Sequence, residues 1–204
     1  MKRLSSFKYN ANYVIRMDDI IREGHPVLRT VAEPVKLPLS EEVQGTLQCM
    51  MEFLKNSQNP ETAAKYKLRS GVGLSANQIG LQQRMFVLYL KDEKGNLLEH
   101  ALVNPKIISH SVSMVYLPES EGCLSVDRPI EGFVPRYETV KVKGYDFSSG
   151  KEVVLRFKGY AAIVIQHEMD HLDGIMFYDR INTENPFKLP QDVSIRSLYE
   201  KKGK

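Results

Sequence analysis

Apolar residues recur at helical spacing in two segments of the chain. The first segment, LPLSEEVQGTLQCMMEFLKN, begins with Ser40, which can cap the first turn of a helix. Its apolar positions share one face: Val43, Leu47, Met50 and Leu54. The second, GYAAIVIQHEMDHLDG, predicts a helix from near Gly159 to Gly174. Its first half is apolar almost all round, so we expect that half to be buried.

Between these helices the pattern changes to short apolar runs and alternation, which are typical of strands. MFVLYL, ALVNPKII and SVSMVYL are strand candidates, and ETVKVKGYDF and KEVVLRF flank a turn to form the clearest hairpin. The sum predicts an α+β fold, in which antiparallel or mixed strands pack around one buried central helix.

The 204 residues are expected to form a single domain over 1–204. Residues from about 1 to 20 are predicted to form an N-terminal arm or short helix lying on the surface. About 182–204 reads as a polar, Pro-punctuated tail, in which the final KKGK is solvated.

Composition narrows the class of protein. Hydrophobic residues make up 42% and charged residues 26%, which excludes wholesale disorder. The net charge of +3 is too small to argue for specific nucleic-acid binding or a membrane surface. Neither a signal peptide nor a stretch of 18 apolar residues is evident, so we expect a cytoplasmic protein with reduced cysteines.

The second helix carries the HExxH pattern in His167, Glu168 and His171. Two histidines four apart on a helix are separated by about 40° around the axis and about 6 Å along it. Both imidazoles can therefore reach one metal ion, and Glu168 lies on the adjoining face, where a general base must sit. Burying two histidines and a glutamate on an apolar helix would cost free energy without a binding partner, and a metal ion would be such a partner.

Two ligands do not hold a catalytic ion, and several third ligands are open. The spacing of metzincins would require a histidine where Phe177 stands, and the downstream glutamates Glu184 and Glu200 lie in polar sequence. Cys123, in EGCLS, is the better candidate, because one thiolate with two imidazoles suits zinc or ferrous iron. Such a site keeps its fourth position for water.

The segment Gly71–Gly80 is small and glycine-rich, but it lacks the spacing of a phosphate loop. It reads as a loop before the strand at 85–90. Its glycines would let a substrate backbone approach, and Gln78 offers an amide donor.

Taken together, GVGLSANQ, EGCLS and QHEMDHLDG resemble, in this order, the three signature motifs of the peptide deformylases. The resemblance extends from about Asp18 to about Ile181, and the length resembles the longer class found mainly in Gram-positive bacteria. One departure is Ser75, where many members have alanine.

The resemblance implies removal of the N-formyl group from the initiator methionine of new proteins, with release of formate and metal-bound water as nucleophile. It implies Cys123, His167 and His171 as ligands of Fe(II), which Ni, Co or Zn can replace. It also implies Glu168 as general acid/base. Gln78 and the N–H of Leu124 would contact the developing oxyanion.

The methionine side chain needs an apolar slot beside these groups. Our candidates flank the motifs, with core packing as the alternative for their side chains: Val72, Gly73, Ile163 and Val164. The expected partners are N-formyl-Met nascent peptides, and we expect a monomer. Whether the arm and tail bring the protein near the ribosome stays open.

Two rival functions remain at this point. A zinc endopeptidase would use a downstream glutamate as third ligand. A non-catalytic module would hold a structural zinc with Cys49 as fourth ligand, although a buried place in the first helix is the simpler reading of Cys49.

Overall fold

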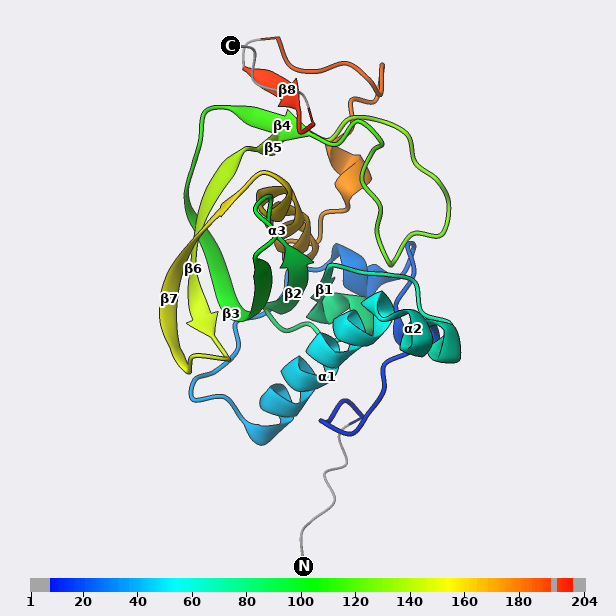
Figure 1. The fold of residues 1–204 in the computed structure, drawn as a ribbon, viewed down its shortest axis with the longest axis vertical. Coiled ribbons are helices and arrows are strands. Elements are labelled where there is room, and N and C mark those ends of the chain that lie inside the picture. Colours follow the sequence, from blue (N-terminus) through cyan, green and yellow to red (C-terminus); the bar gives the residue numbers. More distant parts are fainter. Residues whose placement is uncertain (1–7, 192–193, 200–204) are drawn as a thin grey trace, which may run out of the picture.

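The computed structural model describes residues 8–191 and 194–199, and its main sheet has five strands that run from the left side of the view to the middle (Figure 1). All its neighbouring strands are antiparallel. Their order across the sheet is β1 (Gly73–Ser75), β2 (Met85–Lys91), β3 (Leu97–His110), β6 (Thr139–Asp146) and β7 (Lys151–Lys158). A smaller sheet has the order β5 (Arg136–Tyr137), β4 (Met114–Tyr116) and β8 (Ile195–Ser197), with β4 and β8 parallel.

Three α-helices accompany the sheets. They are α1 (Glu41–Gln58), α2 (Pro60–Tyr66) and α3 (Tyr160–Leu172). Short 3₁₀ turns occupy Met17–Asp19, Pro26–Arg29, Ala76–Ile79 and Phe177–Arg180. None of the helices in the described part of the chain is long and apolar enough to cross a membrane.

Strand β2 is buried on both faces, because α1 and α3 lie on either side of β1 and β2 (Figure 1). Met85 and Val87 join the core cluster that includes α1, whereas Phe86, Leu88 and Leu90 join the cluster that includes α3. Burial on both faces explains why this strand is a continuous apolar run rather than an alternating one.

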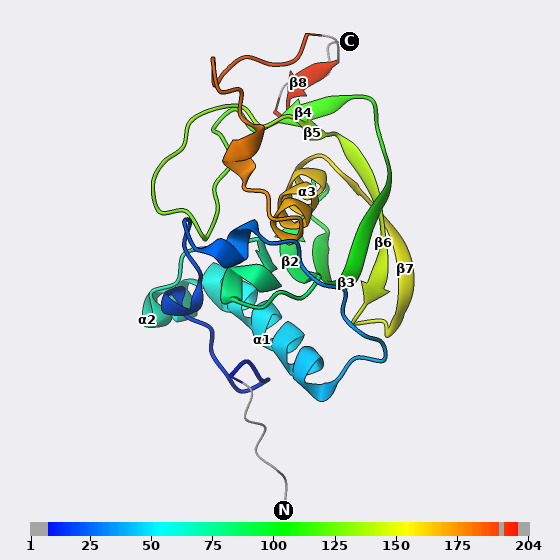
Figure 2. The same ribbon diagram turned by 180° about the vertical axis from the view of Figure 1, so that it is seen from behind.

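Helix α3 is enclosed by the two sheets and by the segment that follows it (Figure 2). Ala161–Ile165 are between 0% and 6% exposed, so the predicted buried first half is confirmed. Gly174 ends the helix with φ +72°, and a Cβ there would lie 2.7 Å from the carbonyl oxygen of Arg29. The α+β prediction with a buried central helix is correct.

The predicted helix after Ser40 and the predicted hairpin are confirmed as well. Ser40 caps α1 by accepting a hydrogen bond from the Val43 N–H at 3.3 Å. The predicted hairpin is β6–β7. Helix α2, strand β1 and the 3₁₀ turn at Ala76–Ile79 were not predicted; the last two occupy the segment interpreted as a loop.

The N-terminal segment has buried anchors in its described part, residues 8–20, although most of its side chains stay exposed or half-buried. Tyr9, Ile15 and Ile20 are buried in the same core cluster as α1, because single apolar residues in a polar segment suffice to anchor it. The tail contributes β8, which was not predicted. Residues 1–7, 192–193 and 200–204, including KKGK, lie outside the described residues.

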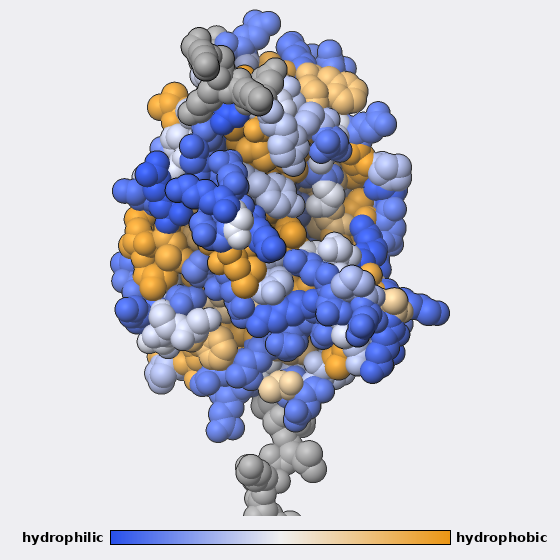
Figure 3. Space-filling view, viewed as in Figure 1, coloured by the Kyte–Doolittle hydropathy of each residue, from blue (hydrophilic) through white to orange (hydrophobic). Residues whose placement is uncertain are grey.

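The large apolar side chains that stay exposed come from several elements and loops. The face in Figure 3 is mostly hydrophilic, with apolar residues in separate patches. The exposed set is Val31, Leu37, Leu97, Ile108, Val112, Val154, Phe187 and Tyr199.

The Asp19 carboxylate fixes the N-terminal segment and yields the first prediction. It accepts hydrogen bonds from Tyr13 Oη at 2.9 Å and the Arg16 N–H at 2.8 Å, and pairs with Lys8 at 2.7 Å. We expect Asp19→Asn to lower the free energy of unfolding by about 1–3 kcal/mol, as measured by urea denaturation. The exposed neighbour gives the control, and Asp18→Asn should change little.

The pH dependence of this effect follows from the same contacts. Burial disfavours the Asp19 carboxylate, but Lys8, the Arg16 N–H and Tyr13 hold its pKa below the usual value. The stabilisation is therefore present at neutral pH and is lost as the pH falls below about 4. A difference between native protein and Asp19→Asn that grew on acidification would contradict this assignment.

Candidate active site

Three potential metal ligands meet where α3 approaches the turn after residue 122. The ligand atoms of Cys123, His167 and His171 all lie within 4.8 Å of one another. Cys123 Sγ is 3.2 Å from His171 Nε2, and the two imidazole ring centroids are 4.8 Å apart. Helical spacing brings the histidines together, and only the tertiary fold adds the cysteine.

A tight turn holds Cys123 in place. The Val126 N–H donates to the Cys123 carbonyl at 3.2 Å, and the Ser125 N–H donates to Sγ at 3.4 Å. Gln78 Nε2 also approaches Sγ, at 3.5 Å. Burial alone would raise the pKa of this thiol, but the facing imidazoles hold it well below its ordinary value. The site therefore favours a thiolate.

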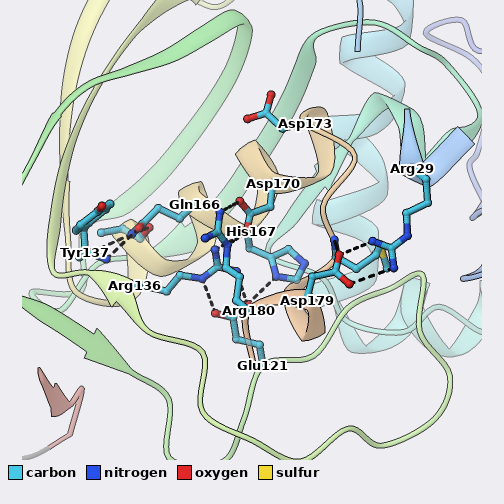
Figure 4. Close-up of polar contacts among 12 residues, drawn as sticks. Arg29, Glu121, Arg136, Tyr137, Gln166, His167, Asp170, Asp173, Asp179 and Arg180 are labelled. Carbon is cyan, nitrogen blue, oxygen red and sulfur yellow. Dashed lines mark hydrogen bonds and ion pairs between the residues drawn. The ribbon is translucent and has the colours of Figure 1, made fainter. Parts of the chain in front are cut away.

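A buried chain of charges supports His167 (Figure 4). His167 Nδ1 lies 2.8 Å from Glu121 Oε2, which leaves Nε2 for an ion. Glu121 receives a bidentate pair of hydrogen bonds from Arg136, at 2.8 and 2.9 Å. Arg136 also pairs with Asp170, which in turn pairs with Arg180. Burial opposes ionisation of Glu121, yet Arg136 and His167 lower its pKa to about 2.

These residues fit a divalent ion. A thiolate with two imidazoles is a donor set for zinc or ferrous iron, and three protein ligands leave a position open for water. The buried Nδ1 of His171 has no hydrogen-bond partner among the described residues, and its Nε2 faces the Cys123 sulfur.

The other ligand candidates lie elsewhere. Cys49 is buried in α1, where its Sγ lies 3.1 Å from the Tyr13 carbonyl oxygen. Glu184 is exposed, and Glu200 lies outside the described residues. Phe177, at the position where a metzincin would have its third histidine, stacks on His167 with ring centroids 5.9 Å apart.

Glu168 lies beside this donor group and against β1. Its side chain is 3% exposed, and Ser75 Oγ donates a short hydrogen bond to its Oε2. A Cβ at position 73 would lie 2.3 Å from Glu168 Oε1, so only glycine leaves room for the carboxylate. Burial raises the pKa of Glu168, with Ser75 and the histidines acting in the opposite direction.

A cavity of about 370 Å³ opens onto the donor group. Its lining includes all the residues that the family resemblance and the expected methionine slot point to, except the fully buried His171: Val72, Gly73, Gln78, Cys123, Leu124, Ile163, Val164, His167 and Glu168. Other lining residues were not predicted from the sequence: Arg69, Ser70, Leu117, Glu121 and Tyr160.

Of the missed residues, only Glu121 had a usable signal. It directly precedes the Gly122-Cys123 pair, and a metal-binding histidine normally has a carboxylate or carbonyl partner. Leu117 and Tyr160 have no local pattern that separates them from ordinary core residues.

Comparison with known proteins decides the family. Residues 17–187 match the family model described as polypeptide deformylase. The chain belongs to the polypeptide deformylase family. It is therefore a metallohydrolase with peptide deformylase activity, and the implied substrate is a formyl-Met peptide.

Individual relatives of this deformylase agree with the assignment. The chain is 57% identical over 179 residues to Peptide deformylase 2 of Bacillus cereus, covering 88% of this chain and 97% of that protein. It is 54% identical over 180 residues to Peptide deformylase 2 of Bacillus subtilis, with the same coverage.

Solved structures of other deformylases share the fold. Peptide deformylase 1B of Arabidopsis thaliana has a TM-score of 0.65 and 30% identity, covering 81% of this chain and 82% of that one. The Thermotoga maritima enzyme has a TM-score of 0.63 and 34% identity, covering 80% and 96%.

The donor set of the deformylase predicts which cysteine retains the ion. Cys123→Ser should lower metal content and activity together, because a hydroxyl replaces a soft thiolate poorly. Cys49→Ala, which changes the other buried cysteine, should leave the metal content of the folded protein unchanged. Elemental analysis of both purified variants tests this, and full metal retention by Cys123→Ser would require another third ligand.

Proposed function

We propose that Glu168 is the general acid/base of deformylation. Support comes from its position in the wall of the cavity, next to the donor group yet outside it. The hydrogen bond from Ser75 and the space left by Gly73 orient the carboxylate. A carboxylate that binds no ion is available to accept and return a proton.

The developing negative charge needs donors, and we assign these to Gln78 and Leu124. Gln78 Oε1 accepts from the Ser75 N–H at 3.0 Å, which turns Nε2 toward Ser125 Oγ and Cys123 Sγ. The Leu124 N–H has no hydrogen-bond acceptor in the described part of the chain. The Gln78 amide is held in place before substrate arrives and the Leu124 N–H is not engaged elsewhere among the described residues, which suits electrostatic stabilisation of an oxyanion.

The reaction then proceeds by proton transfers at named atoms. Glu168 accepts a proton from water as the water oxygen bonds to the formyl carbon. Gln78 and Leu124 donate hydrogen bonds to the formyl oxygen. As the C–N bond breaks, Glu168 returns the proton to the leaving nitrogen, and formate and the free amine depart. A bound divalent ion supplies Lewis-acid chemistry, lowering the pKa of water and polarising the carbonyl.

We assign the methionine side chain to the apolar part of the cavity. Val72, Ile163 and Val164 lie there, joined by Leu117 and Tyr160. An unbranched thioether suits a slot of this kind, because it adapts to irregular apolar walls. We assign Gly73 a place in the cavity wall, where its missing side chain makes room for the Glu168 carboxylate.

Fe(II) is the proposed ion, with Ni, Co or Zn as replacements; the deformylase family implies this preference, and the donor set accommodates it. Nascent formyl-Met chains are the proposed substrates, and the cytoplasm, where translation supplies them, is the proposed compartment. We also propose that the enzyme acts as a monomer.

The role of Glu168 can be separated from metal binding. Glu168→Ala should abolish release of formate from a formyl-Met peptide while the metal content stays unchanged, since Glu168 is not a ligand. The exposed Glu184→Ala is the matched control and should keep full activity. Loss of metal from Glu168→Ala would contradict the assigned role.

A second peptide substrate tests the endopeptidase alternative. An internally quenched peptide without a formyl group should stay intact, because the proposed site is specific for the formyl amide. Cleavage of that peptide, with activity lost in Glu184→Ala, would support the rival function.

Exposure to air tests the proposed ion. Ferrous iron and its thiolate ligand are both open to oxidation, whereas nickel in the same site does not undergo this step under these conditions. The iron form should lose activity in aerated buffer while the nickel form retains it. Mass spectrometry should find any thiol oxidation at Cys123 and not at the core residue Cys49; equal decay of the two forms would contradict iron as the sensitive element.

A further inference from the structure

Arg69 lies at the rim of the cavity and contacts the backbone of the turn that carries Cys123. One terminal nitrogen, Nη2, donates to the carbonyl oxygens of Cys123 at 3.1 Å and Val126 at 3.2 Å. The other, Nη1, donates to the Leu124 carbonyl at 3.5 Å and pairs with Asp127 at 2.8 Å. A single guanidinium thus holds three carbonyls of one tight turn.

Two of these carbonyls belong to the peptide groups that carry the proposed oxyanion donor, the Leu124 N–H, and the donor to Cys123 Sγ, the Ser125 N–H. The Cys123 carbonyl shares its peptide plane with the Leu124 N–H, and the Leu124 carbonyl shares its plane with the Ser125 N–H. Neither peptide bond is cis. In a planar trans peptide the C=O and N–H point in opposite directions, so fixing one fixes the other.

The contacts of the second N–H agree with this geometry. The Ser125 N–H donates to Cys123 Sγ at 3.4 Å, on the side away from the carbonyl that Arg69 holds. A charged donor on a carbonyl also polarises the peptide group, which strengthens the hydrogen bond that its N–H makes.

We propose that Arg69 is a positioning residue for deformylation, which aims and polarises the Leu124 N–H toward the formyl oxygen and the Ser125 N–H toward the thiolate. This inference rests on the proposed role of the Leu124 N–H. Arg69 acts through the backbone, and its side chain needs no contact with the reacting atoms.

Arg22 provides a matched control within the same ion-pair cluster. It pairs with Asp127 at 2.9 Å and donates to the Ile20 carbonyl, but it makes no hydrogen bond to the 123–126 turn within the described residues. Removing Arg22 therefore weakens the surface cluster around Asp127 and leaves the carbonyl contacts of Arg69 in place.

The test compares Arg69→Ala, Arg69→Lys and Arg22→Ala in the metal-loaded full chain. Removing an oxyanion donor outright typically costs ~10²–10³ in kcat, so loosening one should cost about 10-fold. We expect Arg69→Ala to lower kcat by this amount with little change in KM, and Arg22→Ala to match the wild type. Arg69→Lys should recover part of the lost kcat, because lysine restores the positive charge but not the planar guanidinium that binds several carbonyls at once.

Two further readouts separate positioning from a general loss of stability. Dilute guanidinium chloride, far below denaturing concentrations, should raise the kcat of Arg69→Ala and leave that of Arg22→Ala unchanged. The backbone ¹⁵N resonances of Leu124 and Ser125 should move in Arg69→Ala and stay in place in Arg22→Ala.

Three results would overturn the proposal. They are equal losses in Arg69→Ala and Arg22→Ala, a rise in KM at unchanged kcat, and an unchanged kcat despite displaced amide resonances. Gln78→Ala keeps this failure distinct from failure of the proposed function. If wild type releases formate and Gln78→Ala is slow while Arg69→Ala is not, only the role of Arg69 is wrong.

Discussion

A fully buried guanidinium joins the two parts of the metal-binding group. Arg136 is 1% exposed and bridges Glu121, next to the Cys123 turn, and Asp170, on the helix that carries both histidines. Breaking a buried ion pair by removing one partner typically costs about 3–5 kcal/mol, because the other charge stays behind in an apolar setting. The turn and the helix are therefore held in one relative position, which a three-ligand site needs.

The packing around β2 also fixes the position of the cavity residues that lie on β1. Helices on both faces of the sheet leave β1 little freedom, so Gly73 and Ser75 meet Glu168 at one fixed place. Three segments that are distant in sequence thereby converge: residues 72–78, 121–124 and 160–171. Each segment is positioned by a different interaction, namely strand pairing, the buried charges and helix burial.

Sequence patterns predicted those parts of the structure that depend on residues close together in the chain. Helical periodicity predicted α1 and α3, alternation predicted the β6–β7 hairpin, and the i, i+4 spacing predicted the two histidine ligands. The short β1 and β8 have no periodicity of their own, because their partners in the sheet determine them. Arg69 and Arg136 look like any other charged residues in sequence, and only the tertiary fold chooses the carbonyls and carboxylates that they bind.

The contact between Gly73 and Glu168 also links activity to the order of folding. The hairpin and α1 contain mostly local contacts, which can form early in a refolding chain. The native contacts of Glu168 with Gly73 and Ser75 require β1 to pack on α3, and this packing joins segments far apart along the polypeptide. With Glu168 as the proposed general acid/base, hydrolysis of formyl peptides reports completion of the native structure, whereas a circular dichroism signal reports only the formation of its helices and strands.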